Sequence, residues 1–259
     1  MSTTIERAPE LMHSDVPING RRTTLRNILL ASGIGASLVY VAANVFAALV
    51  YDGYSTVNQA VSELSAIDAP SRPLMVTFLI LFGVLSLAFS AGVVWSAGQN
   101  RPLRITGWAL VVVGSINMLA PLFPMHMRGA EGTWTDTAHI IVTAANVLPF
   151  FVAMGFSAWA FGKRFRLYTL TTLATVIVFG IVAGSQGGAI GANEPTPWHG
   201  IYERISIGGY LLWMAVLAVV LLRIPNRAAK KNESQGLTLG KLEIQEGGGN
   251  GTRQPVRSR

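Results

Sequence analysis

The chain has 259 residues, of which 51% are hydrophobic and only 13% are charged, about half the charged share of an ordinary soluble domain. It contains no cysteine, which excludes disulfides, thiolate nucleophiles and cysteine-bound zinc or iron–sulfur clusters. The formal net charge is +7, but the basic residues lie in the tails and short loops around long apolar runs. This distribution gives no support for nucleic-acid binding.

Six apolar stretches are long enough to cross a bilayer, which requires about 20 mostly apolar residues. Only the last of them contains an Asp, Glu, Lys or Arg, namely Arg204 at its start. The stretches are residues 28–50, 73–97, 105–123, 138–161, 168–190 and 204–222. Backbone polar groups in lipid must pair within the protein, and these runs lack the alternation of strands. We therefore predict an all-α fold, a polytopic membrane bundle of six transmembrane helices over residues 28–222.

The two flanking segments are polar. We expect residues 1–27 to form a disordered leader and residues 223–259 to form a disordered basic tail. If both lie in the cytoplasm, 17 of the 20 Lys and Arg residues are on the inner side. This asymmetry follows the positive-inside rule and predicts a multi-pass protein of the cell (plasma or inner) membrane with both termini cytoplasmic.

The first outer connection, residues 51–72, carries apolar residues at helical spacing. Ser55 is placed to cap the N-terminus of a helix, and Pro70 and Pro73 are placed to end it. We expect a short amphipathic helix that lies at the outer membrane interface or dips toward the bundle. Its apolar residues are Val57, Ala60, Val61 and Leu64.

Polar residues form stripes on several of the expected membrane helices. Two stripes have helical spacing, and single amides lie on two other helices. The stripes are Asp136, His139, Thr143 and Asn146, and His199, Glu203, Ser206 and Tyr210; the amides are Asn44, which shares a face with Tyr40 and Tyr51, and Asn117. A polar group facing lipid is costly, so we expect these residues to meet inside the outer half of the bundle.

Three interpretations of this His/Asp/Glu cluster are open. In the first, the protein is structural or accessory, with Asp136 and Glu203 paired with Arg128 and Arg204 to hold the outer loops. In the second, it is an intramembrane metal-dependent hydrolase of a lipid or amphiphile. Its metal, zinc being possible, would be held by His126, His139 and His199, with Glu203 or Asp136 as the catalytic base.

The third interpretation is a small-ligand or proton-coupled transporter, which would bind a lipid or other small molecule. The pocket would be lined by residues from several helices: Glu63, Asn44, Asn117, Thr143, Asn146 and Tyr210. An ionisable group at the bundle end of a membrane helix is a functional hypothesis by default, although structural networks also produce such clusters. The residues alone do not decide among the three.

Four segments follow one another along the chain: YSTVNQAVSELSAIDAPSRPLM, LFPMHMRG, TDTAHIIV and HGIYERISIGGYLLW. In this order they resemble the bacterial membrane proteins grouped as domain of unknown function 998, over about residues 28–222. The resemblance implies six helices in a prokaryotic membrane and supplies no activity.

A more distant resemblance is to the ceramidase-like and progestin-receptor-like hydrolases, which hold a membrane-embedded zinc with three histidines. Candidates for the corresponding polar roles are Ser62 or Ser65, Asp136, His139 and His199. The chain departs from that pattern in having six expected spans and no HxxxH pair on the last of them. This likeness is one of fold-level association.

Overall fold

A computed structural model describes residues 18–224, and within this range the regular structure is helical throughout. Six helices are long and apolar enough to cross a membrane, which confirms the predicted all-helical fold. They are α1 (Ile18–Val50), α2 (Arg72–Ala97), α3 (Arg101–Leu119), α4 (Trp134–Ala160), α5 (Lys163–Gly184) and α7 (His199–Arg223). Three short helices lie in connections: η1 (Val61–Ser65), η2 (Ala120–Leu122) and α6 (Gly187–Gly191).

Several helices extend beyond the apolar runs that revealed them. The helix α1 begins at Ile18, ten residues before the expected span, and α7 begins at His199 rather than at Arg204. Hydropathy marks the part of a helix that lies in hydrocarbon, whereas the helix itself continues through polar residues into the headgroup region. The rest of the expected leader, residues 1–17, and of the expected tail, residues 225–259, lies outside the described residues.

The prediction of an amphipathic helix in the connection between α1 and α2 is wrong. The only helix there is the five-residue η1, and the Oγ of Ser55 accepts from the N–H of Asn58 (3.2 Å), capping a turn instead. A longer helix does not form because side chains from elsewhere in the chain take the backbone carbonyls that its N–H groups would need. Thr56 and Asn58 give their carbonyl oxygens to side chains of Arg204 and Thr196, respectively, which come from the far end of the chain.

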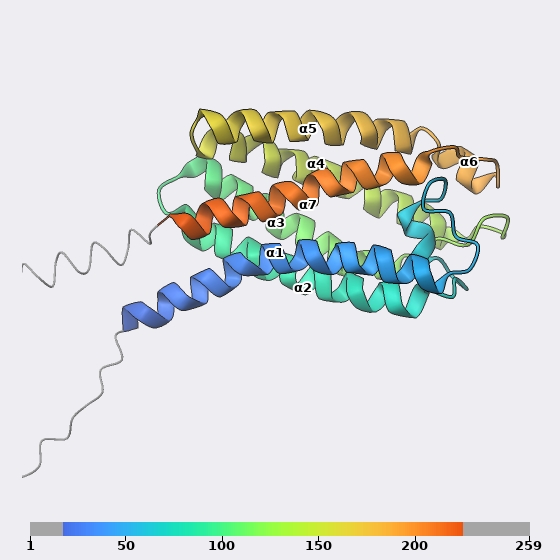
Figure 1. The fold of residues 1–259 in the computed structure, drawn as a ribbon, viewed down its shortest axis with the longest axis horizontal. Helices are drawn as coiled ribbons and strands as arrows, with labels where there is room; N and C mark the ends of the chain where they lie inside the picture. Colours follow the sequence, from blue (N-terminus) through green and yellow to red (C-terminus); the bar gives the residue numbers. More distant parts are fainter. Residues whose placement is uncertain (1–17, 225–259) are drawn as a thin grey trace, which may run out of the picture. The chain divides into compact units, whose positions relative to one another are not determined.

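The long helices pack side by side in chain order (Figure 1). The ring closes because α1 lies against both α2 and α7: the Ser32 hydroxyl donates to the Leu85 carbonyl (3.0 Å) and the Ser37 hydroxyl to the Leu211 carbonyl (2.9 Å). Small residues permit this closeness, since a Cβ at Gly92 would meet the backbone of Leu29 at 3.0 Å. The bundle therefore surrounds a common interior.

Packing is uneven along the bundle. The largest fully buried side chains include Trp213, Phe89 and Met154, which form one apolar core. The buried residues of α4 run only from Ala153 to Ala158, in the second half of that helix. The first half of α4 therefore contributes little to the core, and this is the region where polar residues lie.

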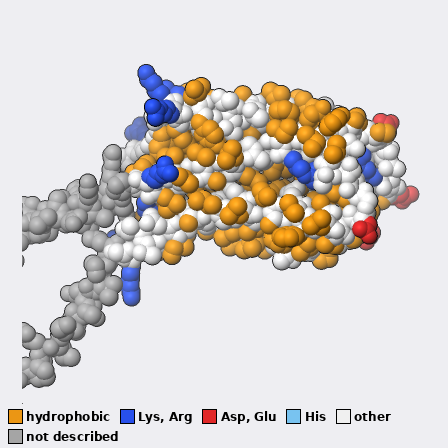
Figure 2. All heavy atoms as spheres, viewed as in Figure 1, with side chains coloured by type: hydrophobic (Ala, Val, Ile, Leu, Met, Phe, Trp, Pro, Cys, Tyr) orange, Lys and Arg blue, Asp and Glu red, His pale blue; other side chains and the backbone are white. Residues whose placement is uncertain are grey.

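A band of hydrophobic side chains separates two ends of opposite charge (Figure 2). At the end formed by the connections α2–α3 and α4–α5, which we call the basic end, the side chains include Arg101, Arg104, Lys163 and Arg164. At the other end, which we call the loop end, the segments 51–71, 120–133 and 185–198 carry the acidic residues Asp52, Glu63, Asp68, Glu131 and Glu194. An apolar band between polar ends is the surface expected of a protein that spans a bilayer.

Arg26 is a buried cation at the basic end, with only 4% of its surface exposed. Its guanidinium donates to the carbonyl of Leu221 (2.9 Å) and to the hydroxyl of Ser96 (2.8 Å), so it joins α1 to α7 and α2. The last carbonyls of a helix have no intrahelical donor, and a cation there also complements the helix dipole. Arg26 thus stabilises the C-terminal end of α7.

Candidate functional site

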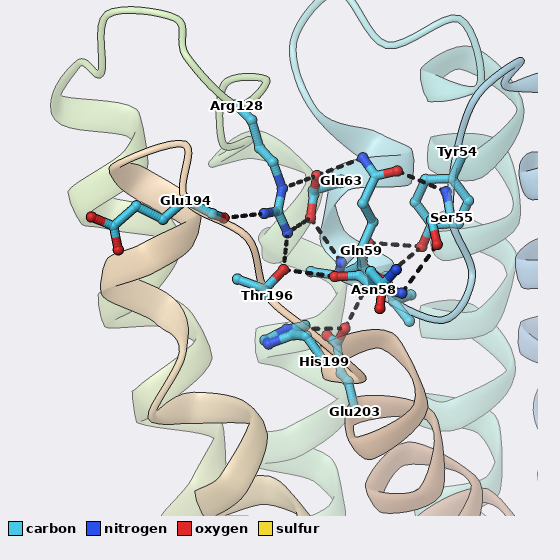
Figure 3. Close-up of polar contacts among 12 residues, drawn as sticks. Tyr54, Ser55, Asn58, Gln59, Glu63, Arg128, Glu194, Thr196, His199 and Glu203 are labelled. Carbon is cyan, nitrogen blue, oxygen red and sulfur yellow. Dashed lines mark hydrogen bonds and ion pairs between the residues drawn. The ribbon is translucent and has the colours of Figure 1, made fainter.

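The three connections of the loop end meet at one guanidinium (Figure 3). Arg128 donates through Nε and Nη2 to the two carboxylate oxygens of Glu63, both at 2.8 Å, which is a bidentate ion pair. Its Nη2 also donates to the hydroxyl of Thr196 (2.7 Å), and its Nη1 donates to the carbonyl of Glu194 (3.1 Å). We call Arg128, Glu63 and Thr196 the clasp, because they join segments 51–71, 120–133 and 185–198.

Glu63 is a charged residue that is only 3% exposed. Burial by itself would raise the pKa of this carboxyl, but hydrogen bonds from Arg128, from Gln59 Nε2 (2.9 Å) and from the Ala60 N–H (2.7 Å) outweigh burial. The pKa of Glu63 therefore lies below its ordinary value, and the clasp is ionised at neutral pH.

A second set of contacts holds segment 51–60 against the first turns of α7. Arg204 donates to the carbonyls of Thr56 (2.9 Å) and Gly200 (3.0 Å) and to the phenol oxygen of Tyr54 (2.7 Å). Burial raises the pKa of Tyr54 to about 12 despite the nearby Arg204, so the phenol stays protonated and donates to the carbonyl of Ala60 (2.9 Å).

The backbone at the start of α7 is in an unusual conformation. Trp198, the residue before the helix, has φ 63°, a left-handed conformation that strains a bulky residue by about 1–3 kcal/mol. Its N–H donates to the side-chain oxygen of Asn58 at 3.0 Å. A Cβ at Gly200 would collide with the carbonyl oxygens of Thr56 and Gln59. These constraints fix where the next residues, His199 and Glu203, are presented.

The ion pairs Asp136–Arg128 and Glu203–Arg204 are absent from the described residues. This part of the first interpretation, in which these pairs hold the loops, is therefore wrong. Asp136 instead caps α4, accepting from the N–H groups of Thr133 (2.8 Å) and His126 (2.7 Å) and from His126 Nδ1 (2.7 Å). Successive residues on a helix point about 100° apart. Arg204 therefore faces segment 51–60, whereas Glu203 faces the bundle interior.

The half of the bundle nearer the loop end contains a cavity in two adjoining parts that share lining residues. The part near the loop end has a volume of about 480 Å³ and is lined by His139, His199 and Glu203 among others. The deeper part has a volume of about 440 Å³ and is lined by Tyr210 and Phe150 among others. Both parts share lining residues, among them Asn117, Thr143, Asn146, Gly180 and Ser206. We call the two parts together the inner cavity.

His199 and Glu203 form the polar wall of the inner cavity. His199 Nε2 is 3.8 Å from Glu203 Oε2, and this same oxygen accepts from the N–H of Val61 at 2.6 Å. About 25% of the Glu203 side chain is exposed, and the residue lines the cavity. His199 Nδ1 is buried and has no hydrogen-bond partner within residues 18–224. Both groups are therefore placed to bind a polar ligand group.

His139 and the amide pair Asn117–Asn146 complete the polar lining. His139 Nδ1 lies 2.9 Å from the carbonyl of Phe123, and because a carbonyl only accepts, Nδ1 carries the proton and Nε2 of the neutral ring is an acceptor. Asn146 Nδ2 donates to Asn117 Oδ1 at 2.9 Å. The other oxygen of this pair, Asn146 Oδ1, is buried and lacks a partner among the described residues.

The remaining candidate residues lie elsewhere. His126, in the connection 123–133, is bound to Asp136 at the start of α4. Glu63 belongs to the clasp, and Asn44 lines a separate depression beside Arg204. No three His, Asp or Glu side chains within residues 18–224 come close enough together to hold a metal ion. The geometry therefore gives the zinc hypothesis no support.

The sequence reasoning missed the roles of Gln59 and Thr196, which complete the clasp. Gln59 lies in the segment expected to form an amphipathic helix, but its side-chain Nε2 donates to Glu63. Thr196 carries no helical periodicity because it lies in a connection, and its hydroxyl donates to the carbonyl of Asn58 (2.7 Å). We expected Glu63 to line a ligand pocket; its place beside the apolar residues Val61 and Leu64 is the sequence feature that could have pointed to a buried ion pair.

Comparison with known proteins agrees with this architecture. A family model described as "Protein of unknown function (DUF998)" matches residues 34–220, which include all six long helices wholly or in large part. No curated protein and no solved structure gives a significant match. The match covers well over half of the chain, together with the clasp and every residue of the inner cavity named above. The chain belongs to the DUF998 family of integral membrane proteins.

Proposed function

We propose that the protein binds one amphiphile, a molecule with a polar head and a hydrocarbon tail, in the inner cavity within the membrane. The observation that carries the proposal is the chemical difference between the two adjoining parts of the inner cavity. His199, Glu203 and His139 line the part near the loop end, whereas Phe150 and Tyr210 line the deeper part. Each part is within the size range of small-molecule sites, about 300–1,000 Å³.

Buried polar atoms without hydrogen-bond partners support placing the polar head of the ligand in the part of the inner cavity near the loop end. A buried donor or acceptor without a partner costs about 1–3 kcal/mol. His199 Nδ1 and Asn146 Oδ1 both lack a partner within residues 18–224, and both residues line the inner cavity. Rotation of either side chain toward the inner cavity would let a ligand head supply the missing hydrogen bond and remove that cost.

The composition of the lining favours a neutral or cationic head. No Lys or Arg is among the described residues that line either part of the cavity, and Glu203 is the one carboxylate there. Arg204 and Arg128 are nearby in sequence or space, but they are engaged by segment 51–60 and by Glu63. An anionic head would meet Glu203 without a cation to balance it.

The side of the bundle between α4 and α5 supports access from the lipid. Val147 of α4 and Ile181 of α5 line the inner cavity and are also 44% and 66% exposed. These two helices lie next to each other (Figure 1). An amphiphile already in the bilayer would therefore enter tail and head together, without passing the clasp.

The expected location places this site near the outer surface of the cell membrane. By the positive-inside rule, the charge asymmetry supports a cytoplasmic location for the basic end and an external location for the loop end. The amphiphile would then be bound from the outer leaflet, with the clasp forming a cover between the cavity and the external solution.

Native mass spectrometry of the purified protein tests this proposal with three probes that share one chain: oleylamine, oleoylglycerol and oleic acid. We expect retention of the first two and weaker retention of oleic acid. Gly184→Leu fills open space in the cavity and should weaken retention about tenfold, equivalent to about 1.4 kcal/mol. Glu203→Gln should lower the preference for oleylamine over oleoylglycerol.

The matched control is Gly187→Leu, three residues further along the chain, at a glycine that also has open space but does not line the cavity. This variant should bind the probes as the wild type does. Equal retention by the wild type and Gly184→Leu would show that the inner cavity is not the binding site. A preference for oleic acid would contradict the proposed neutral or cationic head.

A further inference from the structure

Another concave surface lies toward the basic end of the bundle, between α3 and α4. We call it the arginine groove; it has a volume of about 820 Å³. The residues that define it here are Arg101, Arg104, Trp108, Ala145, Leu148 and Pro149. None of them lines the inner cavity, so the groove is a separate feature of the fold.

The charge at one end of the arginine groove is unbalanced. Arg101 and Arg104 are exposed, and neither forms an ion pair within residues 18–224. The acidic residues of this range all lie toward the loop end of the bundle. Two guanidiniums three residues apart on one helix face therefore offer several hydrogen-bond donors to an anion at the basic end.

The rest of the groove is apolar and runs along the membrane-spanning part of the two helices. Trp108 is 59% exposed and Leu148 is 71% exposed, while Ala145 leaves space between them. Val112, which also lines the groove, lies eight residues after Arg104 and hence about 12 Å deeper. The lining thus changes from cationic to hydrocarbon-like over the depth of one membrane leaflet.

Pro149 contributes to the shape of the groove. Proline has no N–H, so it cannot donate to the carbonyl of Ala145 four residues earlier, and both residues lie in the groove wall. Helices bend at such positions, because a ladder hydrogen bond is missing and the ring crowds the preceding turn. Pro149 is therefore a feature of the α4 sequence that favours a hollow beside Ala145.

We infer that the arginine groove binds one anionic phospholipid, with its phosphate on Arg101 and Arg104 and an acyl chain along α3 and α4. The charge complementarity identifies the head, and the apolar floor identifies the tail. Arginine suits a phosphate because its planar guanidinium donates two parallel hydrogen bonds. Trp108, one helical turn from Arg104, packs beside the lipid at the level of the interface.

The test uses the full chain in nanodiscs of equal parts phosphatidylglycerol and phosphatidylcholine, followed by native mass spectrometry of the lipid that stays bound. We expect phosphatidylglycerol to be enriched on the wild type. The double variant Arg101→Gln/Arg104→Gln should lower this enrichment by up to about 25-fold, because each basic residue contributes about fivefold near an anionic surface. Ala145→Leu should lower it without any change in charge, because it fills the groove.

The matched control is Lys163→Gln/Arg164→Gln, which removes the same charge from exposed residues at the same end but outside the groove. It should keep the enrichment. An equal loss in the control and in the arginine variant would show general electrostatic attraction and overturn the inference, as would unchanged enrichment in Ala145→Leu. Retention of the oleylamine probe should not change in any groove variant, which separates this site from the inner cavity.

Discussion

Replacing Arg128 by Met should destabilise the bundle more than replacing any other arginine at the loop end. The variant leaves the Glu63 carboxylate, 3% exposed, without its bidentate partner. Removing one member of a buried pair costs about 3–5 kcal/mol. Glu63 keeps its bonds from Gln59 and Ala60, and the Arg128 side chain is 15% exposed, so we expect about 2–4 kcal/mol after allowing for solvent screening.

For a domain of this size each kcal/mol shifts the unfolding midpoint by about 2–4 °C, so the expected drop is about 5–15 °C. Thermal unfolding in detergent, followed by tryptophan fluorescence, measures it. The control is Arg72→Met, which removes a cation that donates to one backbone carbonyl, that of Ser65 (2.7 Å), and should cost only about 1 kcal/mol.

The difference in unfolding midpoint between the wild type and Arg128→Met should depend on pH in a defined direction. The folded pKa of Glu63 is below its ordinary value of about 4.3, so its stabilisation is fully present above that value and is lost as the pH falls through the folded pKa. In Arg128→Met the effect of burial prevails and raises this pKa, so protonation should stabilise the variant. The two midpoints should converge on acidification; a gap that is independent of pH, or no larger than that of Arg72→Met, would refute the reasoning.

Three further substitutions test the surrounding contacts. Gly200→Ala should displace segment 51–60 and cost about 1–3 kcal/mol, whereas Gly208→Ala on the same helix, with open space around it, should be neutral in the same unfolding assay. Tyr54→Phe should cost about 1–2 kcal/mol, and the difference in tyrosinate absorbance from the wild type should appear only near pH 12. Arg26→Met should cost about 2–4 kcal/mol at the basic end, because the carbonyl of Leu221 loses a buried donor, and it should leave probe binding unchanged; a neutral effect would contradict the role of Arg26 as a cap.

The fold was predictable because lipid imposes strong constraints on sequence. Apolar length identifies a membrane helix almost by itself, since a spanning segment must satisfy its own backbone hydrogen bonds. The helix ends were harder to predict from the sequence, as α1 shows by starting at Ile18 among polar residues. Hydropathy carries no information on how far a helix continues outside the hydrocarbon.

The candidate site was only partly predictable, and the reason lies in how side chains find partners. Periodicity places Thr143, Asn146 and Glu203 on helix faces, and these residues line the inner cavity. Periodicity does not predict the contacts of residues in connections, where Arg128 pairs with Glu63 and not with Asp136. That choice depends on the path of segments 51–71 and 123–133, which long-range backbone contacts such as the Ile67 N–H to Met125 carbonyl bond (2.8 Å) determine.

Photo-crosslinking would examine the orientation of a bound amphiphile directly. Two forms of oleylamine, one with a diazirine beside the amine and one with it near the end of the chain, are incubated with the protein in nanodiscs and the labelled residues are identified by mass spectrometry. We expect the first form to label residues around His199 and Glu203 and the second to label residues around Phe150 and Tyr210. Labelling confined to lipid-facing residues such as Val41 and Leu49 of α1, with either form, would contradict binding in the inner cavity.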